Sequence, residues 1–268
     1  MSTYVVTGAA SGMGAALAAE LCEEGHRVIG VDLAHAEVTA DLATDDGRRA
    51  ALRRIGELLP DGTLDGFVPF AGLAAATGRP GSLMVSVNHF GAVRLLEGLR
   101  PALLRSSRGP AAVLVSSNSA TCQPGWPTEL ATACLAGDED EARALADRAG
   151  GVATYPATKA ALAWYVREHA GTHAWAGSGV RLNAVAPGLI DTPMTAAGRT
   201  DPLTADGMAA YPVPLGRAGR AAEVTAAVRF LLSPAASFCV GTVLCADGGT
   251  EALLRSRHWP IPLDPAAG

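Results

Sequence analysis

The chain has 268 residues, a formal net charge of −5 and hydrophobic side chains at 49% of its positions. This length suits one domain around a single core. The acidic balance argues against the basic surface of a nucleic-acid-binding protein, and no apolar run reaches the roughly 20 residues of a membrane-spanning helix. Because no basic residues precede the first apolar ones, we expect no signal peptide.

Strand-like and helix-like segments alternate along the chain. Apolar runs predict strands at 3–8, 26–33, 64–72, 109–117, 179–188 and 241–249. Helical spacing predicts helices at 13–25, 45–59, 87–105, 155–170 and 221–233. This alternation predicts an α/β fold, a doubly wound parallel sheet of Rossmann type flanked by helices. We expect a single domain over 1–268, with a surface tail over 250–268.

Five cysteines are spread along the chain without a Cys-x-x-Cys pair, at positions 22, 122, 134, 239 and 245. An odd, scattered set of thiols favours reduced cysteines in a cytoplasmic protein. No spacing of metal ligands is found among them, so the sequence predicts no metal site.

A glycine-rich turn joins the first predicted strand to the first predicted helix. Its sequence is TGAASGMG, with Gly8, Gly12 and Gly14 placed so that the backbone can approach a pyrophosphate closely. The free N–H groups and the positive dipole end of the helix favour an anion at this point. The turn therefore predicts a dinucleotide site, which also includes Ser11 and Met13.

A carboxylate, Asp32, ends the second predicted strand. An acidic side chain at this distance from a glycine-rich turn accepts hydrogen bonds from adenosine ribose hydroxyls and repels a 2′-phosphate. No Arg follows directly, so the sequence favours NAD over NADP. The alternative interpretation is an ordinary strand-end Asp that caps a turn.

The only Lys of the chain is Lys159, four residues after Tyr155, whereas Arg provides every other long basic side chain. On a helix this spacing places both side chains on one face. A nearby ammonium favours the phenolate and would lower the pKa of the Tyr from its reference value near 10. A compact ammonium can also bind a ribose, for which Arg is a poor replacement. The pair predicts proton-transfer chemistry.

These motifs, with VNHFGA, LVSS, YPATK and LNAVAPGLIDTPM in this order, resemble the classical short-chain dehydrogenases/reductases over essentially the whole chain. The resemblance implies hydride exchange with a nicotinamide and a catalytic tetrad. In it Tyr155 is the general acid/base, Ser117 binds the substrate oxygen, Lys159 binds the ribose, and Asn88 holds a water of the proton relay. The alternatives are that Ser116 replaces Ser117 and that Asn88 is a helix cap.

The resemblance also implies further cofactor contacts. The predicted residues are Asp41 and Leu42 at the adenine, Ala71 and Gly72 behind the cofactor, and Pro187, Gly188, Ile190 and Thr192 at the nicotinamide end. One departure is PFAG, Pro69 to Gly72, where the family has Asn-Asn-Ala-Gly. Because the Asn pair normally stabilises the central sheet, we expect this support to come from other residues.

An inserted segment, about 122–151, separates Ser117 from Tyr155. It resembles the branch that contains bacterial 3α-hydroxysteroid dehydrogenase/carbonyl reductase and coniferyl alcohol dehydrogenases. Its acidic part predicts a short helix with an apolar stripe and an ion pair between Glu139 and Arg143. The stripe covers either the substrate entrance or an interface, or the helix is a solvated addition. The resemblance implies that the outer face of the Tyr155 helix forms the tetramer contact of the family, so an insert beside this helix predicts a homodimer, with a tetramer as the alternative.

A substrate lid is expected at about 193–215, which has loop residues, two Met and few charges. Trp126 and Pro127 of the inserted segment are predicted to join the pocket. The expected substrate is a small hydrophobic alcohol or carbonyl compound, either a 3α-hydroxysteroid or an aromatic allylic alcohol of coniferyl type. The chain is therefore predicted to be an NAD-dependent alcohol dehydrogenase or carbonyl reductase. The alternative is a catalytically silent NAD-binding sensor or interaction protein.

Overall fold

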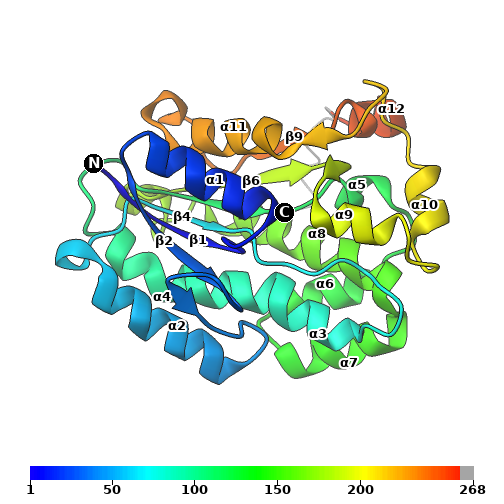
Figure 1. Cartoon of the computed structure of the whole chain (residues 1–268), viewed down its shortest axis with the longest axis horizontal. Helices are drawn as coiled ribbons and strands as arrows, with labels where there is room; N and C mark the ends of the chain where they lie inside the picture. Colours follow the sequence, from blue (N-terminus) through cyan, green and yellow to red (C-terminus); the bar gives the residue numbers. More distant parts are fainter. Residues whose placement is uncertain (260–268) are drawn as a thin grey trace.

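A central sheet of seven parallel strands confirms the predicted α/β architecture in the computed structural model, which describes residues 1–259 (Figure 1). The strands lie in the order β3 (Val38–Thr39), β2 (Arg27–Asp32), β1 (Thr3–Thr7), β4 (Gly66–Pro69), β5 (Ala111–Val115), β6 (Arg181–Pro187) and β9 (Val243–Ala246). Along the chain the order runs outward from β1 to β3, then returns to β4 beside β1. This reversal opens a crevice at the carboxyl ends of β1 and β4, where doubly wound sheets bind ligands.

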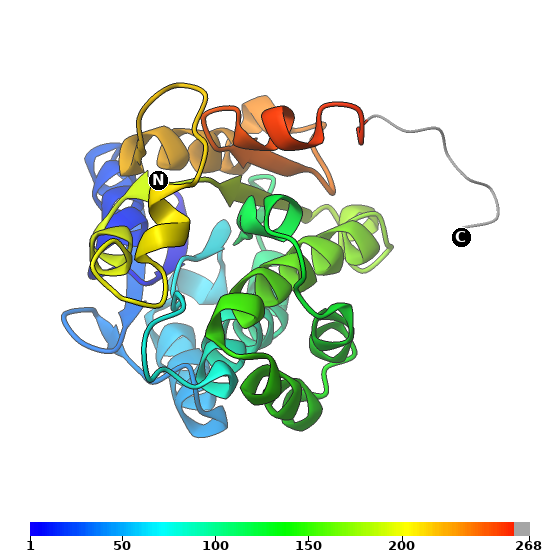
Figure 2. The same cartoon turned by 90° about the vertical axis from the view of Figure 1, so that its right-hand side faces the viewer.

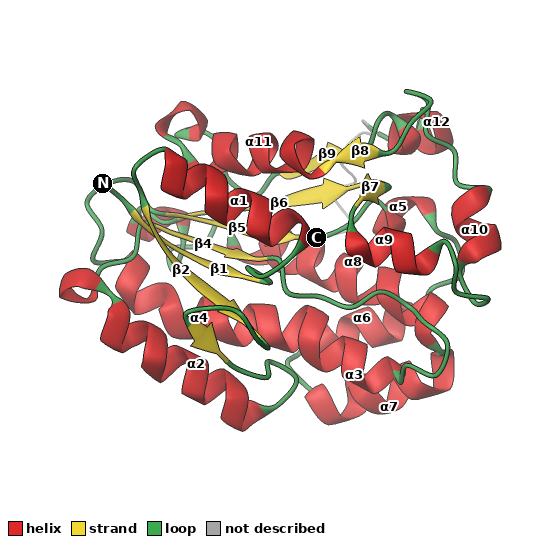
Figure 3. Ribbon diagram, viewed as in Figure 1, coloured by secondary structure: helices red, strands yellow, loops and turns green. Residues whose placement is uncertain are grey.

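Helices cover both faces of the sheet, as Figure 3 shows. Helices α1 (Gly12–Glu23) and α11 (Ala221–Leu232) pack on one face, where their apolar side chains meet β1, β5 and β6. Helices α2 (Asp45–Leu58), α4 (Ala92–Leu103) and α8 (Gly151–His169) pack on the other. Side chains on both faces of strands β1 and β5 are buried, which explains their continuous apolar runs.

Several predicted boundaries are wrong. The single helix expected over 87–105 is divided into a π-helical turn, η2 (Ser86–Gly91), and α4, and a short helix α3 (Gly81–Val85) precedes its predicted start. Helix α8 begins at Gly151, before the expected start at Tyr155, because Gly150 ends the preceding helix and the chain re-enters a helix at once. Strand β3 has only two residues and was not predicted.

The inserted segment contains two helices, although only one was predicted. They are α6 (Thr128–Leu135) and α7 (Glu139–Ala149), and both pack against α8 (Figure 2). Their shared core includes Ala142 and Ala146, which are fully buried, so the predicted apolar stripe packs within the domain. The predicted Glu139–Arg143 ion pair is wrong, because Glu139 pairs with Arg48 and Arg143 donates to Ser86 Oγ.

Short elements complete the fold. They are η1 (Pro60–Gly62), α5 (Ser119–Cys122), η3 (Ala176–Ser178), β7 (Ile190–Asp191), α9 (Pro193–Gly198), α10 (Ala205–Ala209), β8 (Gly219–Arg220), η4 (Pro234–Ala236) and α12 (Thr250–Arg255). The predicted tail thus begins as a helix, while its residues 260–268 lie outside the described part. Within residues 1–259, none of the helices combines the length and hydropathy needed to cross a bilayer.

Candidate active site

The glycine-rich turn lies at the reversal point of the sheet, between β1 and α1. Gly8 has φ +68°, in the left-handed region that favours glycine, and an added Cβ would lie 2.7 Å from the Ala71 amide nitrogen. At Gly14 an added Cβ would lie 2.1 Å from the Gly8 carbonyl oxygen. Both positions therefore require glycine, because side chains there would push the turn away from β4 and open the start of α1.

A groove of about 500 Å³ extends from this turn along the carboxyl edge of the sheet. Eleven of the predicted cofactor residues line it: Gly8, Ser11, Gly12, Met13, Gly14, Asp32, Asp41, Leu42, Ala71, Gly72 and Thr192. Further lining residues were not predicted as cofactor contacts: Leu33, Ala40, Phe70, Leu73, Arg79, Leu83 and Val87, together with Pro193 and Met194 of the predicted lid. Most of these residues are next to a predicted cofactor residue in the sequence. This neighbourhood was the only signal that could have identified them.

Asp32 holds the turn as well as facing the groove. Its Oδ2 accepts a hydrogen bond from the Ala10 amide at 2.9 Å, and its Oδ1 accepts one from the Leu33 amide at 2.7 Å. The carboxylate thus joins the end of β2 to the glycine-rich turn. Asp32 therefore caps the turn, as in the alternative interpretation, and also lines the groove, as the cofactor interpretation requires.

The support lost with the Asn pair comes from Thr7 and Asn88. The Thr7 hydroxyl accepts a hydrogen bond from the Ala71 amide at 3.0 Å. Asn88, inside η2 and almost fully buried, binds Leu73 through both ends of its amide, at 2.7 and 2.9 Å. These bonds fix the backbone that follows β4, which forms one wall of the groove. Because Asn88 lies inside a helical turn, the helix-cap alternative is wrong.

Three of the predicted residues at the nicotinamide end lie outside this groove. Pro187 is the last residue of β6, and its carbonyl accepts hydrogen bonds from the Asn118 amide and the Ser117 hydroxyl. Gly188 lines the neighbouring pocket instead. Ile190 is buried in β7, where it pairs with Gly219, and its carbonyl accepts a hydrogen bond from Thr195.

The carboxyl end of β5 and the first turns of α8 bring Ser117 and Tyr155 together. A hydrogen bond with Ser117 acts to lower the pKa of Tyr155, but burial has the larger effect, so this pKa is raised above its usual value of 10. The neighbouring Ser116 has a different partner, since its hydroxyl donates to the Lys159 carbonyl at 2.8 Å. Of the two serines, only Ser117 lines a pocket together with Tyr155.

Lys159 lies one helical turn beyond Tyr155, as the spacing predicted. Its ammonium nitrogen is 5.7 Å from the centre of the Tyr155 ring and donates to the Val115 carbonyl at 2.9 Å. Burial lowers the pKa of Lys159 to about 8. The expected lowering of the Tyr155 pKa by this ammonium is not found, because burial of the phenol dominates and the ammonium is directed toward a backbone carbonyl.

A second pocket of about 460 Å³ opens in front of Tyr155 and Ser117. It is lined by Ala74, Ala75, Ser117, Asn118, Ser119, Cys122, Gln123, Pro124, Val152, Tyr155, Gly188, Leu189, Met194, Thr195, Gly198, Leu203, Thr204, Gly207, Met208 and Tyr211. Eight of these, from Met194 to Tyr211, belong to the predicted lid, and two more, Gly188 and Leu189, follow the end of β6. None carries a formal charge at neutral pH.

The predicted contribution of Trp126 and Pro127 to this pocket is wrong. The Trp126 ring packs against Trp164 of α8, with the ring centres 5.8 Å apart, and its N–H donates to the Ala120 carbonyl. Pro127 precedes the first turn of α6. The inserted segment instead contributes its first residues, from Cys122 to Pro124.

A hydrogen-bonded chain that begins in the wall of the pocket was not predicted. The Tyr211 hydroxyl donates to Asn118 Oδ1 at 2.9 Å, and Asn118 Nδ2 donates to Asp247 at 3.0 Å. It links the lid to the residue after Ser117 and to the end of β9. The position of Asn118 beside Ser117 was the only signal in the sequence.

Two family models match the chain. Residues 2–129 match the model described as short chain dehydrogenase, and residues 142–251 match the model described as enoyl-(acyl carrier protein) reductase. Residues 130–141, inside the inserted segment, lie between the two matched ranges.

Similar proteins are known over nearly the full length. The chain is 40% identical to 3-alpha-hydroxysteroid dehydrogenase/carbonyl reductase from Comamonas testosteroni, over 97% of this chain and 100% of that protein. It is 34% identical to cis-4-hydroxycyclohexanecarboxylate dehydrogenase from Sinomonas cyclohexanicum, over 93% and 96%. A solved structure of 3-alpha-hydroxysteroid dehydrogenase from Pseudomonas sp. B-0831, complexed with NADH, superposes with a TM-score of 0.90 at 43% identity, covering 96% of this chain and 99% of that one.

Proposed function

Because the chain belongs to the short-chain dehydrogenase family, we propose that it is an NAD-dependent oxidoreductase that interconverts a hydrophobic alcohol and its carbonyl compound. One observation carries this proposal: the groove with the glycine turn and Asp32 adjoins the uncharged pocket that contains Ser117 and Tyr155. A cofactor and an alcohol can therefore lie side by side at the carboxyl edge of the sheet.

The residues of the groove fit NAD. The close approach of backbone at Gly8 and Gly14 leaves room for a pyrophosphate at the start of α1. Asp32 provides a carboxylate for ribose hydroxyls, and Leu33 follows it where an NADP site would benefit from an Arg. When bound, NAD supplies the acceptor for a hydride.

The tetrad residues carry out and support the proton transfer. In the oxidation direction, Tyr155 in its phenolate form would accept the hydroxyl proton of the alcohol, and NAD held in the groove would supply the acceptor for the carbinol hydride, so that a carbonyl remains. Ser117 donates a hydrogen bond to the substrate oxygen, and Lys159 holds a positive charge on the far side of the Tyr155 ring. Asn88 keeps the wall behind the cofactor in place and holds the water of the proton relay. In the reduction direction the same phenol donates its proton to the carbonyl oxygen.

The substrate class follows from the pocket. A volume of about 460 Å³ with an apolar, uncharged lining suits a neutral ligand of several rings. The names of two relatives describe a 3-alpha-hydroxysteroid and a hydroxycyclohexanecarboxylate. Cyclic secondary alcohols of steroid type are therefore the first choice, and aromatic allylic alcohols of coniferyl type are the second.

A panel of alcohols tests this function. NADH formation would be followed with a 3α-hydroxysteroid, coniferyl alcohol, cyclohexanol and a linear secondary alcohol, each with NAD and with NADP. We expect the highest kcat/KM for the steroid with NAD. NAD binding without turnover of any alcohol would favour the alternative of a cofactor-sensing protein, and faster turnover of coniferyl alcohol would favour the second substrate class.

We also propose a cytoplasmic homodimer. The inserted helices α6 and α7 cover the outer side of α8 with a buried apolar cluster, so this surface is used within the subunit. Exposed apolar side chains occur instead on and beside α11, β9 and α12, including Phe230, Phe238 and Leu253. Light scattering is expected to give the mass of two chains, and a stable tetramer would contradict the proposal.

A further inference from the structure

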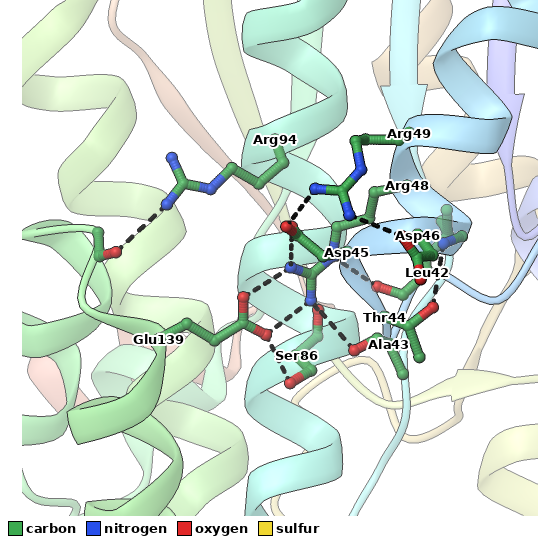
Figure 4. Close-up of polar contacts among 12 residues, drawn as sticks. Leu42, Ala43, Thr44, Asp45, Asp46, Arg48, Arg49, Ser86, Arg94 and Glu139 are labelled. Atoms are coloured by element: carbon green, nitrogen blue, oxygen red, sulfur yellow. Dashed lines mark hydrogen bonds and ion pairs between the residues drawn. The ribbon is translucent and has the colours of Figure 1, made fainter.

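Arg48 is a buried cation at the first turn of α2, only 2% exposed. Its guanidinium makes a bidentate ion pair with Glu139 of the inserted helix α7, at 2.6 and 2.7 Å (Figure 4). Its Nε donates to the Leu42 carbonyl at 2.8 Å, and Nη2, which also donates to Glu139, reaches the backbone carbonyls of Ser86 at 3.0 Å and Ala43 at 3.3 Å. One side chain thus joins three segments that are distant in the sequence.

Two of these segments form walls of the cofactor groove. Leu42 lines the groove from the loop between β3 and α2, and Val87, directly after Ser86, lines it from η2. The two walls are in close contact, because an added Cβ at Gly91 of η2 would lie 3.2 Å from Leu42 Cβ. The guanidinium of Arg48 lies behind this junction and fixes the backbone of both walls.

Glu139 holds the guanidinium in this orientation. Its Oε1 also accepts a hydrogen bond from the Ser86 hydroxyl at 2.7 Å, and that hydroxyl accepts one from Arg143 at 2.6 Å. Asp45 Oδ1, 3.7 Å from Arg48, is the only other carboxylate that pairs with it in the described structure. Removing the charge of Glu139 would leave a buried cation with a weaker, largely exposed partner.

We propose that Glu139 and Arg48 are positioning residues for the adenine half of the cofactor site. The inference rests on the proposed function, because it takes the groove to hold NAD. The inserted segment then sets cofactor affinity from behind the groove, besides covering α8. Arg is required at position 48, because a Lys ammonium cannot serve one carboxylate bidentately and three carbonyls at once.

The experiment compares Glu139→Gln with Glu141→Gln. Both changes neutralise one carboxylate of α7, but Glu141 is exposed and pairs with Arg148 at 3.5 Å, away from the groove. For Glu139→Gln we expect the dissociation constants of NAD and of AMP to rise about tenfold. Because the nicotinamide end is untouched, kcat at saturating NAD and the KM for the alcohol should stay within twofold. Glu141→Gln should leave all four quantities unchanged.

A purely structural role would give a different pattern, in which the melting temperature falls while the AMP and NAD affinities of the folded enzyme stay the same. That result would overturn the inference. As a second variant, Glu139→Asp keeps the charge on a shorter side chain and should recover part of the AMP affinity. A folded Glu139→Asp protein that binds AMP as weakly as Glu139→Gln would show that the charge at position 139 does not position the groove, and would likewise contradict the inference.

The outcomes separate this inference from the proposed function. If the unmodified chain binds NAD and AMP but oxidises no alcohol, the proposed reaction fails, and AMP binding by the variants still decides the role of Glu139. If the unmodified chain binds neither nucleotide, the cofactor site and this inference both fail.

Discussion

The cofactor groove and the substrate pocket share Met194 in their linings but are built in different ways. The groove is formed mostly by residues before position 90, largely in short stretches that follow strands, and four of its lining residues are glycines. The pocket is formed by side chains from the loops after β5 and β6, the start of the inserted segment and α8. The groove therefore depends on strict geometry, whereas the pocket depends on which side chains its loops carry.

This difference predicts opposite responses to substitution. In the groove an added methyl group at Gly14 meets a carbonyl oxygen at 2.1 Å, so change is costly whatever residue is chosen. In the pocket, exchange of one apolar lid residue for another should change the choice of alcohol and leave cofactor binding intact. Each prediction below tests one side of this division or the boundary between the two sites.

The largest effect is expected at Tyr155, which lines the pocket. Tyr155→Phe removes the proposed proton-transferring hydroxyl and should lower kcat by roughly a thousandfold. The dissociation constant of NAD should change by less than threefold, because the groove does not include this hydroxyl. Steady-state kinetics and titration with NADH measure the two quantities. Tyr165→Phe, also on α8, removes a hydroxyl 3.4 Å from Glu97 and serves as the matched control. Full activity of Tyr155→Phe would exclude the mechanism.

The second prediction concerns Lys159, the buried cation beside Tyr155. Burial lowers the pKa of Lys159 to about 8, against an ordinary value of 10.5. Between these two pKa values, Lys159 is protonated in the unfolded chain but deprotonated in the folded chain. The free energy of unfolding that Lys159 contributes therefore increases as the pH rises. The shift corresponds to about 3 kcal/mol over this window.

The Lys159→Met protein should lack this increase in the free energy of unfolding between pH 8 and pH 10.5. Urea unfolding of both proteins from pH 7 to pH 10.5 measures this. The unfolding free energy of the unmodified chain minus that of Lys159→Met should increase with pH, and the titration of other groups cancels in this difference. If the two proteins keep a constant difference in unfolding free energy over this range, Lys159 is not the strongly perturbed cation that the structure indicates.

The sequence predicted the groove well for a physical reason. Turn geometry and strand ends are local, so glycines 8, 12 and 14 and Asp32 could be placed from spacing alone, and the structure puts all four in one groove. The order of alternating segments likewise fixed a parallel sheet. The i, i+4 spacing of Tyr155 and Lys159 correctly placed both side chains on α8. It did not predict the pKa shifts of the two groups.

The parts that could not be predicted depend on partners far along the chain. Glu139 pairs with Arg48 and not with Arg143, four residues away, because a buried guanidinium with several acceptors outweighs an exposed helical pair. Trp126 faces Trp164 and not the pocket, since burial against α8 could not be read from the local pattern. The raised pKa of Tyr155 also required the tertiary structure, because burial sets it.

The third prediction tests the groove. Asp32→Asn keeps the size of the side chain but removes the charge that is proposed to bind ribose hydroxyls and repel a 2′-phosphate. Loss of charged hydrogen bonds should raise the KM for NAD about twentyfold and should reduce the preference for NAD over NADP. Kinetics with both cofactors measure this, with Glu37→Gln as the control, because Glu37 pairs with Arg27 outside the groove. An unchanged cofactor preference would mean that Asp32 acts only through its bonds to Ala10 and Leu33.

The smallest effect is expected in the pocket, at Tyr211. Its hydroxyl donates to Asn118, which in turn donates to Asp247, so Tyr211→Phe releases the lid from the residue that follows Ser117. Loss of one neutral hydrogen bond should raise the KM for the alcohol about fivefold, with the KM for NAD unchanged, because Tyr211 belongs to the pocket alone. Tyr165→Phe is again the matched control. An equal rise in both KM values would show that the lid serves the cofactor as much as the substrate, and the division between groove and pocket would then not hold at this point.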